Sequence, residues 1–233
     1  MRLSIVIPAY NEEKRIPKTL EAYYTFFTNK LKKDFEIIVV PNNCKDNTLD
    51  IVKEFANKKD NIRIHNIPYY VGKGGAVIEG FKLAKGDLIG FTDADNSTNP
   101  ENFYKLFLNI GNFDGIIASR RKKGAIVIPK RRFVRDMLSL AFNLYANLLF
   151  NFKFKDTQCG AKIFTKKTTS ILTKKSTEKG WVFDLDLLYI CKKNRLKIKE
   201  CPIFWKDSIG SKLTLKDEMK SAFNVLKYRV KNI

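Results

Sequence analysis

The sequence predicts an α/β fold whose mostly parallel sheet is covered by helices on both faces. Short runs of apolar, β-branched residues alternate with helical stretches through the first half of the chain, which is the rhythm of βαβ units. These runs are apolar throughout, as strands buried on both faces are, whereas half-exposed strands alternate apolar and polar residues. Ligands of open parallel sheets bind beyond the carboxyl ends of the strands, so we look for functional residues there.

Each element follows from a local pattern. Strands are expected in the segments LSIVIPAY, FEIIVV, IRIHNI and DLIGFTDAD, and helices at about Glu12–Leu31, Thr48–Lys58 and Lys73–Lys85. The second half is less regular, with a very basic stretch near residues 120–135, an amphipathic helix, a strand-like IKECPIFW and a basic C-terminal helix. Because there is no internal repeat or long linker, we expect residues 1–233 to form a single domain.

The amino-acid composition limits which partners and which catalytic groups the protein is expected to use. The chain has 233 residues and a formal net charge of +20, which favours polyanionic partners such as nucleic acid, anionic lipid headgroups or phosphorylated substrates. Its four cysteines lack the paired spacing of a zinc site, so we expect reduced thiols in a cytosolic protein. A Ser-His-Asp or Cys-His mechanism would need the sole histidine, His65, which lies in an expected strand. Catalysis by carboxylates and a metal ion is therefore favoured. We expect no signal peptide and no membrane-spanning segment.

The acidic triplet Asp93-Ala94-Asp95 follows an apolar strand. Two carboxylates one residue apart at a strand end can bind one hard divalent cation, Mg²⁺ or Mn²⁺, which neutralises diphosphate oxygens and the charge that develops on a leaving nucleotide. The plainer interpretation is a solvated turn or helix cap before the following polar segment. The position opposite other polar strand ends favours the metal site.

Polar or glycine-rich segments follow the other strands as well. After the first strand, Tyr10 can pack on a base or ribose and Glu12 can accept hydrogen bonds. Asn42 follows the second strand. In the segment GKGGAV, glycines allow close backbone approach, the following helix offers its N-terminal amides, and Lys73 supplies a cation for phosphate. We expect all of these segments at one edge of the sheet.

The chain resembles the family 2 glycosyltransferases of the Rossmann-like GT-A fold, and within them the enzymes that load a sugar onto dolichyl or another polyprenyl phosphate. The resemblance is carried by SIVIPAYNEE, GKGGAV, FTDADNST, DTQCGAKIF, GWVFDLDLLY and FWKDSIGSKL. It implies an inverting enzyme that moves a hexose, with glucose favoured, from a UDP-sugar or alternatively a GDP-sugar to a polyprenyl phosphate at the cytoplasmic membrane face. Residues 1–118 would then bind the nucleotide-sugar and residues 119–233 the acceptor.

The resemblance also implies roles for particular residues. The catalytic residues would be Asp93, Asp95 and Asp184, of which the first two would bind the metal ion. The nucleotide-sugar would contact Pro8, Ala9, Tyr10, Glu12, Asn42, Lys73, Asp93, Ala94 and Asp95. The acceptor phosphate would contact Arg120, Arg131 and Arg135, next to an acceptor loop that contains Gln158, Cys159 and Gly160. Where the family usually has two aspartates, this chain has Pro41 and Asn42, which leaves the identity of the base open.

Two interpretations of the helix at Met137–Phe150 stay open. Ser139, Asn143 and Asn147 recur every four residues and form a narrow polar stripe on an otherwise apolar helix. The helix is too short to cross a membrane, but basic residues at both ends suit a position in the headgroup region of an anionic membrane. The plainer alternative is a core helix packed on the sheet. Both hold if different faces of the helix serve the two purposes.

Other functions also stay open on the sequence. A glycan hydroxyl acceptor would need a carboxylate such as Asp184 as general base. Asp184 and Asp186 point to different sides of a helix, so at most one faces the donor sugar, and we favour Asp184. The exchange at Pro41 and Asn42 also suits a nucleotide-sugar-binding protein that has lost activity. Nucleic acid is disfavoured because no groove-reading motif accompanies the charge. The sequence sets no oligomeric state.

Overall fold

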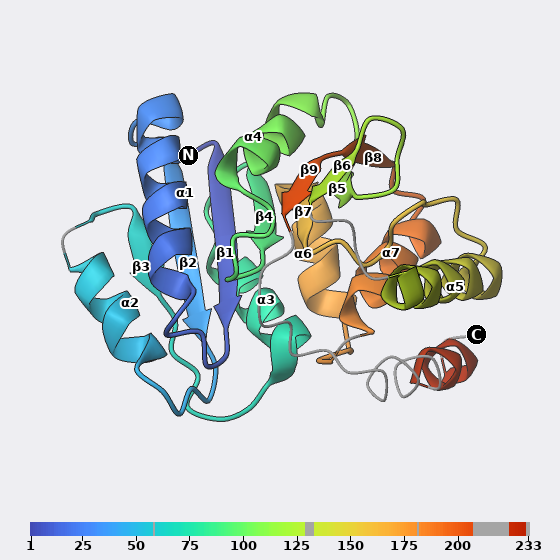
Figure 1. Cartoon of the computed structure of the whole chain (residues 1–233), viewed down its shortest axis with the longest axis horizontal. Helices are drawn as coiled ribbons and strands as arrows, with labels where there is room; N and C mark the ends of the chain where they lie inside the picture. Colours follow the sequence, from blue (N-terminus) through green and yellow to red (C-terminus); the bar gives the residue numbers. More distant parts are fainter. Residues whose placement is uncertain (58, 129–132, 181, 207–223, 232–233) are drawn as a thin grey trace.

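The computed structural model of the chain describes residues 1–57, 59–128, 133–180, 182–206 and 224–231 (Figure 1). Its elements are β1 (Leu3–Ala9), α1 (Ile16–Leu31), β2 (Phe35–Pro41), α2 (Thr48–Ala56), β3 (Ile62–Ile64), α3 (Gly72–Leu83), β4 (Leu88–Thr92), α4 (Pro100–Asn109), β5 (Gly115–Ser119), β6 (Ile126–Ile128), α5 (Phe133–Phe150), β7 (Ala161–Thr165), α6 (Lys166–Lys175), α7 (Phe183–Lys193), β8 (Ile198–Pro202) and β9 (Phe204–Lys206). Residues 224–231 are also helical.

The main sheet has seven strands in the order β3-β2-β1-β4-β7-β5-β8, and a separate pair joins β6 to β9. β7 runs antiparallel to both of its neighbours, while the remaining strands of the sheet are parallel to one another. The predicted α/β fold with a mostly parallel sheet is therefore confirmed. The chain order reverses at β1, because α1 leads from β1 to β2 whereas α3 leads across to β4. Such a reversal opens a crevice at the carboxyl ends of the central strands.

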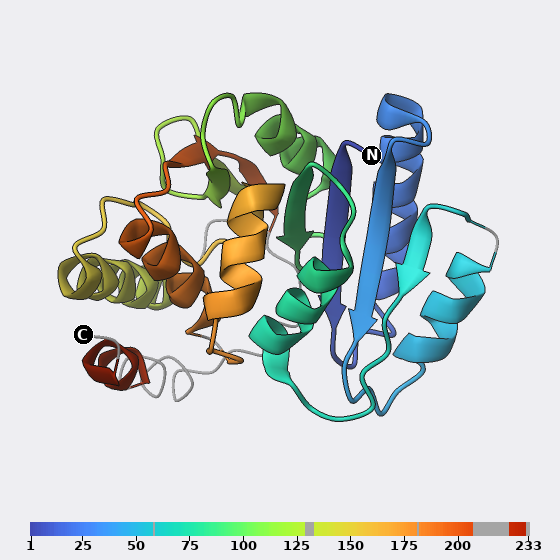
Figure 2. The same cartoon turned by 180° about the vertical axis from the view of Figure 1, so that it is seen from behind.

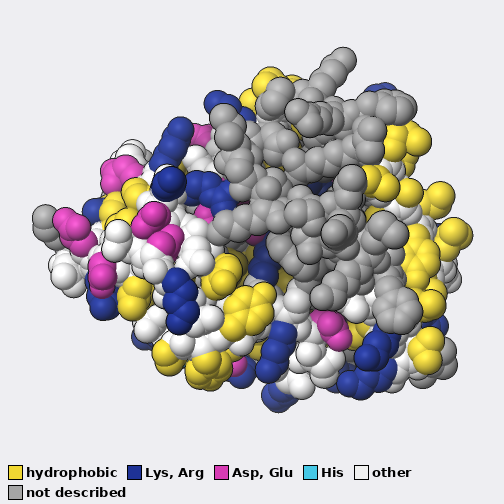
Figure 3. Space-filling model, turned by 60° about the horizontal axis from the view of Figure 1, so that its bottom comes forward, with side chains coloured by type: hydrophobic (Ala, Val, Ile, Leu, Met, Phe, Trp, Pro, Cys, Tyr) yellow, Lys and Arg dark blue, Asp and Glu magenta, His cyan; other side chains and the backbone are white. Residues whose placement is uncertain are grey.

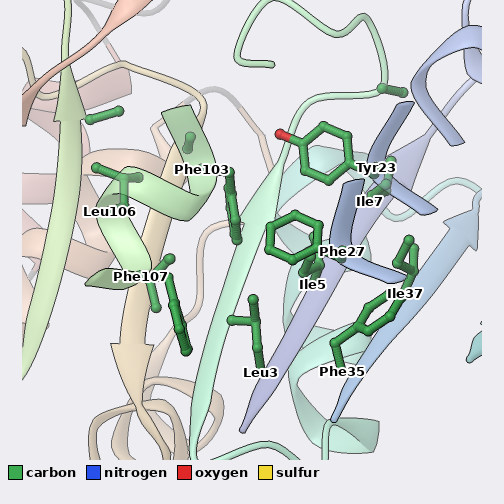
Figure 4. Close-up of a cluster of buried hydrophobic side chains, with 14 of the residues drawn as sticks. Leu3, Ile5, Ile7, Tyr23, Phe27, Phe35, Ile37, Phe103, Leu106 and Phe107 are labelled. Atoms are coloured by element: carbon green, nitrogen blue, oxygen red, sulfur yellow. The ribbon is translucent and has the colours of Figure 1, made fainter. Parts of the chain in front are cut away.

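Helices cover both faces of the sheet (Figures 1 and 2). On one face, Leu3, Ile5 and Ile7 of β1 pack with aromatic residues of α1 and α4 (Figure 4). On the opposite face, Val6 of β1 packs with residues of α3 and α7, as the alternation of side chains along a strand requires. Continuous apolar strands are thus buried from both sides, which fixes the sheet and holds the loops at its carboxyl edge.

Element boundaries differ from the predictions at a few points. The helix expected from Glu12 begins at Ile16, because Pro17 favours the first helical turn and the backbone at Glu12 forms a preceding turn that caps it. The helix expected to reach Lys58 ends at Ala56, and Lys58 lies outside the described residues. The strand expected through residue 67 ends at Ile64, although residues 65–67 continue to hydrogen-bond along β2.

The polar stripe of α5 faces the protein. Ser139 and Asn143 are buried, and Asn143 and Asn147 donate to or accept from backbone groups of residues 154–157. These asparagines provide hydrogen-bond partners for the backbone of a segment between α5 and β7, which has no regular secondary structure of its own. The core interpretation of the helix therefore holds for this face, where Ala146 and Phe150 also pack inward.

The opposite face of α5 is apolar and exposed. At least half of the surface of each of four side chains on it is open to solvent: Met137, Leu140, Leu144 and Leu148. In Figure 3, hydrophobic side chains gather along the right-hand side of the molecule, the side on which α5 lies in Figure 1. Among the described residues, no helix combines the length and the hydropathy that a membrane crossing needs.

Candidate active site

Three turns after β1, β2 and β4 form the edge where the functional residues were expected. Each turn contains an asparagine with a positive φ, and these are Asn11 at 54°, Asn43 at 52° and Asn96 at 57°. Asparagine tolerates this left-handed conformation better than most residues with a side chain. The sequence thus bends the chain sharply at the end of each strand, which keeps the following residues at the sheet edge.

The turns after β1 and β2 are locked together. The backbone amides of Glu12 and Glu13 donate to the side chains of Thr48 and Asp46, and the amide of Lys45 donates to Asn11 Oδ1. Thr48 begins the helix expected at about Thr48–Lys58, and the structure shows that Asp46 and Thr48 also connect the two turns. Burial alone would raise the pKa of Asp46, but the hydrogen bonds it accepts outweigh this effect and lower the pKa.

The predicted base-reading residue, Asn42, is buried beside the end of β1. Its backbone amide and its Nδ2 both donate to the carbonyl oxygen of Ala9, at 2.9 and 3.2 Å. Its Oδ1 has no hydrogen-bond partner in the part of the chain that the structure describes. Such a buried, unpaired acceptor costs free energy, on the order of 1–3 kcal/mol, unless another group donates to it.

The acidic triplet is held in place by helix α1. Thr19 Oγ1 donates to the carbonyl oxygen of Ala94 at 2.7 Å, and the hydroxyl of Tyr23 lies 2.6 Å from the carbonyl oxygen of Thr98. Both side chains are buried. Sequence reasoning missed these two supports, because their partners lie 75 residues further along the chain. Their polar groups on an otherwise apolar helix face were the available signal.

Lys73 and Asp93 form an ion pair with 2.6 Å between Nζ and Oδ1. Burial acts to lower the pKa of Lys73, but the charges of Asp93 and Asp184 outweigh it and raise that pKa. The pKa of Asp93 is raised by partial removal from water and by the charge of Asp95, and Lys73 opposes this shift. The structure therefore brings the predicted phosphate-binding lysine and both predicted metal ligands into one electrostatic cluster.

The two aspartates suit a divalent cation as hard oxygen ligands, the type that Mg²⁺ and Mn²⁺ prefer. Within the described residues, no group of three or more His, Cys, Asp or Glu side chains is placed to hold a metal ion. Asp93 and Asp95 could therefore hold a cation only if other oxygens completed its coordination, and diphosphate oxygens are suitable ones. This requirement fits a cation that arrives together with its nucleotide.

The expected acceptor loop packs directly on Asp93. A Cβ atom added at Gly160 would lie 1.8 Å from Asp93 Oδ2, so only a glycine allows the loop and the carboxylate to sit this close. Cys159 in the same loop is fully buried, which raises the pKa of its thiol to about 12, and Gln158 is partly exposed. The residues predicted for the acceptor loop thus adjoin those predicted for the metal ion.

Arg120 was expected to bind the acceptor phosphate, and the structure shows it committed to Asp156. Its Nε and Nη2 donate to the two carboxylate oxygens at 2.7 and 2.8 Å, and its guanidinium lies 5.6 Å from the ring centroid of Trp205. Burial alone would raise the pKa of Asp156, but the charge and hydrogen bonds of Arg120 hold it below its usual range. This pair fixes the start of the acceptor loop.

Asp184 and Asp186 point in different directions, as predicted. Asp184 accepts from the ammonium group of Lys162, a fully buried lysine that also donates to the carbonyl oxygen of Cys159. Asp186 instead accepts from the hydroxyl groups of Tyr228 and Ser176. Asp184 therefore belongs to the cluster near the acceptor loop, whereas Asp186 connects α7 to the C-terminal helix.

The remaining predicted residues lie in different settings. The carboxylate of Glu12 is bound by Arg15 at 2.6 Å, Pro8 and Ala9 end β1, and Tyr10 is partly exposed beyond it. Arg131 lies outside the described residues, and Arg135 lies in the first turn of α5 with its side chain outside them. Most of the segment FWKDSIGSKL also lies outside the described part of the chain.

Known proteins with similar sequences support the predicted family. The family description "Glycosyl transferase family 2" matches residues 4–179. A dolichyl-phosphate beta-glucosyltransferase of Trichomonas vaginalis is 32% identical over 98% of this chain and 73% of its own length. The human protein of that name is 30% identical over 91% of this chain and 69% of its own length.

Solved structures support the fold. Glucosyl-3-phosphoglycerate synthase from Mycobacterium tuberculosis, in complex with Mn²⁺ and UDP-glucose, superposes with a TM-score of 0.72 at 18% identity, over 98% of this chain and 78% of that one. The family match and this fold together identify the chain as a glycosyltransferase of the GT-A fold. The chain belongs to glycosyltransferase family 2, which confirms the family that the sequence predicted.

Proposed function

We propose that the enzyme transfers glucose from UDP-glucose to a dolichyl or other polyprenyl phosphate at a membrane surface, with inversion at the anomeric carbon. The observation that carries this proposal is the meeting of two segments at Asp93. Lys73, from the glycine-rich segment, binds one carboxylate oxygen, and the acceptor loop packs at Gly160 against the other. A donor diphosphate bound there would place its sugar beside the acceptor loop.

The names of the relatives support the choice of substrates. The similar proteins from Trichomonas vaginalis and human are dolichyl-phosphate beta-glucosyltransferases, and the structural neighbour was solved with UDP-glucose. The basic chain, with its formal net charge of +20, suits two anionic substrates and an anionic lipid surface. GDP-sugars remain the alternative donor, because Asn42 replaces the usual aspartate.

Asp93 and Asp95 are the proposed ligands of a divalent cation. Such a cation, when bound, neutralises the charge that develops on the departing nucleoside diphosphate. Lys73 lies against Asp93 in the structure, and we propose that its ammonium group contacts the diphosphate when the donor binds. Lys73 would then exchange one anion for another and would remain paired throughout.

In the proposed reaction, an oxygen of the acceptor phosphate forms a bond to the anomeric carbon while the bond from that carbon to the UDP oxygen breaks. A phosphate monoester is already anionic near neutral pH, so no residue needs to act as a strong general base. Asp184 is proposed to orient the sugar through the carboxylate oxygen that Lys162 does not bind. Lys162 and Arg120 are proposed to position the acceptor loop.

The acceptor phosphate is proposed to bind Arg131 and Arg135, which precede or begin α5. The exposed apolar face of α5 supports this arrangement, because it would lie in the headgroup region while the polar face stays bound to the protein. Leu226 and Val230 of the helix at residues 224–231 are also exposed, and Tyr228 of that helix packs beside Phe150 of α5. The lipid phosphate would then reach the site from the membrane side.

The test is a donor panel with the purified chain. UDP-glucose, UDP-N-acetylglucosamine and GDP-mannose are incubated with polyprenyl phosphate in vesicles, with Mg²⁺ or Mn²⁺ and then with EDTA. We expect a glucosyl lipid from UDP-glucose that needs the metal ion, and NMR of the product should show the anomer opposite to that of the donor. No lipid-linked product from any donor would contradict the proposal. Transfer to a free glycan alone would support the hydroxyl-acceptor alternative.

A further inference from the structure

Two consecutive tyrosines, Tyr69 and Tyr70, are exposed in the segment between β3 and α3. They are 66% and 64% exposed, so neither ring is part of the hydrophobic core. Adjacent aromatic side chains that are exposed to solvent often mark a binding site for a ligand or a partner protein. Neither residue belongs to a motif with an expected role, and the proposed reaction uses neither.

The segment that carries these tyrosines is fixed along the candidate donor site. The amide of Ile67 donates to the carbonyl oxygen of Pro41, and the amide of Asn43 donates to the carbonyl oxygen of Ile67. The segment therefore runs beside the turn that contains Asn42. Three residues after Tyr70 comes Lys73, which binds Asp93. Along this segment, Tyr70 therefore comes between the residue that passes the Asn42 turn and the lysine that binds Asp93.

Tyr70 contacts Tyr10, but Tyr69 is not part of that ring pair. The ring centroids of Tyr10 and Tyr70 are 5.5 Å apart and the ring planes are inclined by 73°. Two rings at this angle form a corner, in which a flat base can stack on one ring while its edge meets the other. Tyr10 directly follows Ala9, whose carbonyl oxygen binds Asn42.

The unpaired acceptor of Asn42 points to the same ligand. Its Oδ1 is buried and has no hydrogen-bond partner among the residues that the structure describes. A pyrimidine imide or purine N–H group is the kind of donor that would satisfy it. Aromatic rings and an unpaired amide oxygen, both beside the end of β1, together suit the base of a nucleotide better than a sugar or a phosphate.

We propose that Tyr70 is a donor-binding residue, which forms with Tyr10 the aromatic corner that receives the nucleotide base. This inference rests on the proposed function, since it places the base of the donor beside β1 and β2. Stacking of a base on an aromatic side chain contributes about 1–3 kcal/mol, so loss of the Tyr70 ring is expected to weaken nucleotide binding about 5- to 150-fold.

The experiment is titration calorimetry of the whole chain with UDP and with GDP, each in the presence of Mn²⁺, and with inorganic pyrophosphate as a probe that has no base. Tyr70→Ala should raise the Kd of the nucleotide that binds and leave the Kd of pyrophosphate unchanged. Tyr70→Phe keeps the ring and should bind like the unchanged chain. Tyr69→Ala is the matched control, because Tyr69 is equally exposed and lies next to Tyr70.

The outcomes separate this inference from the proposed function. If a nucleotide binds and Tyr70→Ala leaves its Kd unchanged, or if Tyr69→Ala weakens it equally, the inference is wrong and the proposed function stands. An equal loss of pyrophosphate binding would also overturn the inference, because the base would not be involved. If neither UDP nor GDP binds the unchanged chain, the proposed function and this inference both fail.

Discussion

The two halves of the chain differ in where their buried charged side chains lie. In residues 1–118, apolar strands pack between helices, and the functional turns project from the edge of that sheet. The buried Glu36 of this half pairs with Arg63, but it lies near the start of β2, at the end of the sheet opposite the site. In the second half, buried polar pairs fix the segments that adjoin the site, namely Arg120 with Asp156, Lys162 with Asp184, and Tyr228 with Asp186.

Apolar packing and buried ion pairs also respond differently to mutation. Apolar packing tolerates substitutions of similar volume, so the donor half can accept many sequences. A buried ion pair tolerates little, because loss of one partner leaves the other charged group without compensation. The acceptor loop should therefore be the part of the site whose position is most easily lost.

The largest expected effect on stability is at Arg120. Arg120→Met leaves the carboxylate of Asp156 buried and unpaired, so we expect the free energy of unfolding to fall by about 3–5 kcal/mol. Arg121→Met is the matched control, because Arg121 pairs with the exposed Asp136 and should contribute about 0–1 kcal/mol. Urea unfolding of the two variants measures both values. Equal losses would show that the buried pair does not distinguish the acceptor half.

Asp95→Asn should affect chemistry and leave the fold intact. The change removes a predicted metal ligand, and a cation contributes several kcal/mol to the transition state, so we expect transfer to fall by at least about 100-fold. An amide oxygen can still accept from the amide of Ser97, as Asp95 Oδ1 does, so the urea midpoint should barely move. Asp50→Asn on α2 serves as the control. A large loss of stability would mean that the turn depends on its charge.

The pH dependence of stability should differ in sign between Arg120→Met and the unchanged chain. With Arg120 present, the pKa of Asp156 is depressed, so the stabilisation is complete above about pH 4, the unfolded value, and is lost as the pH falls through the folded value. Without Arg120, burial raises that pKa, and protonation then favours the folded chain. The difference in unfolding free energy between the two proteins should shrink from pH 7 to pH 4. A constant difference would contradict this explanation.

The smallest effect is expected on the exposed face of α5. Leu144→Gln removes apolar surface that already faces solvent, so the free energy of unfolding should change by less than about 0.5 kcal/mol. Sedimentation with vesicles that contain anionic lipid should nevertheless show weaker binding, if this face contacts the membrane. Leu108→Gln, on the exposed surface of α4, is the control and should leave vesicle binding unchanged.

The same contrast explains what the sequence could predict. The first strand was predicted in the segment LSIVIPAY, and β1 lies there at Leu3–Ala9, because an uninterrupted apolar run needs no distant partner to be recognised. The turns and the acidic triplet followed from the ends of such runs. The bond of Arg120 to Asp156 could not be predicted, because it joins residues 36 positions apart and depends on the completed sheet.

For the polar stripe on α5, the sequence predicted the spacing of the residues but not the direction in which they point. The spacing of Ser139, Asn143 and Asn147 correctly predicted one polar face, but the direction in which it points depends on the neighbouring segment. Asn143 and Asn147 turn inward because the backbone at residues 154–157 needs hydrogen-bond partners. Polar residues of a helix are therefore not always on its solvent side.

Gly160 illustrates how a residue without a side chain can limit variation in a sequence. Its φ is not positive, so the backbone itself would accept other residues, and it has no side chain that could contact a substrate. A β-carbon there would nevertheless occupy the space of the Asp93 carboxylate. Even alanine, the mildest replacement, would push the acceptor loop and the acidic triplet apart. This position is therefore restricted to glycine by the space that the Asp93 carboxylate needs, and not by any chemistry of its own.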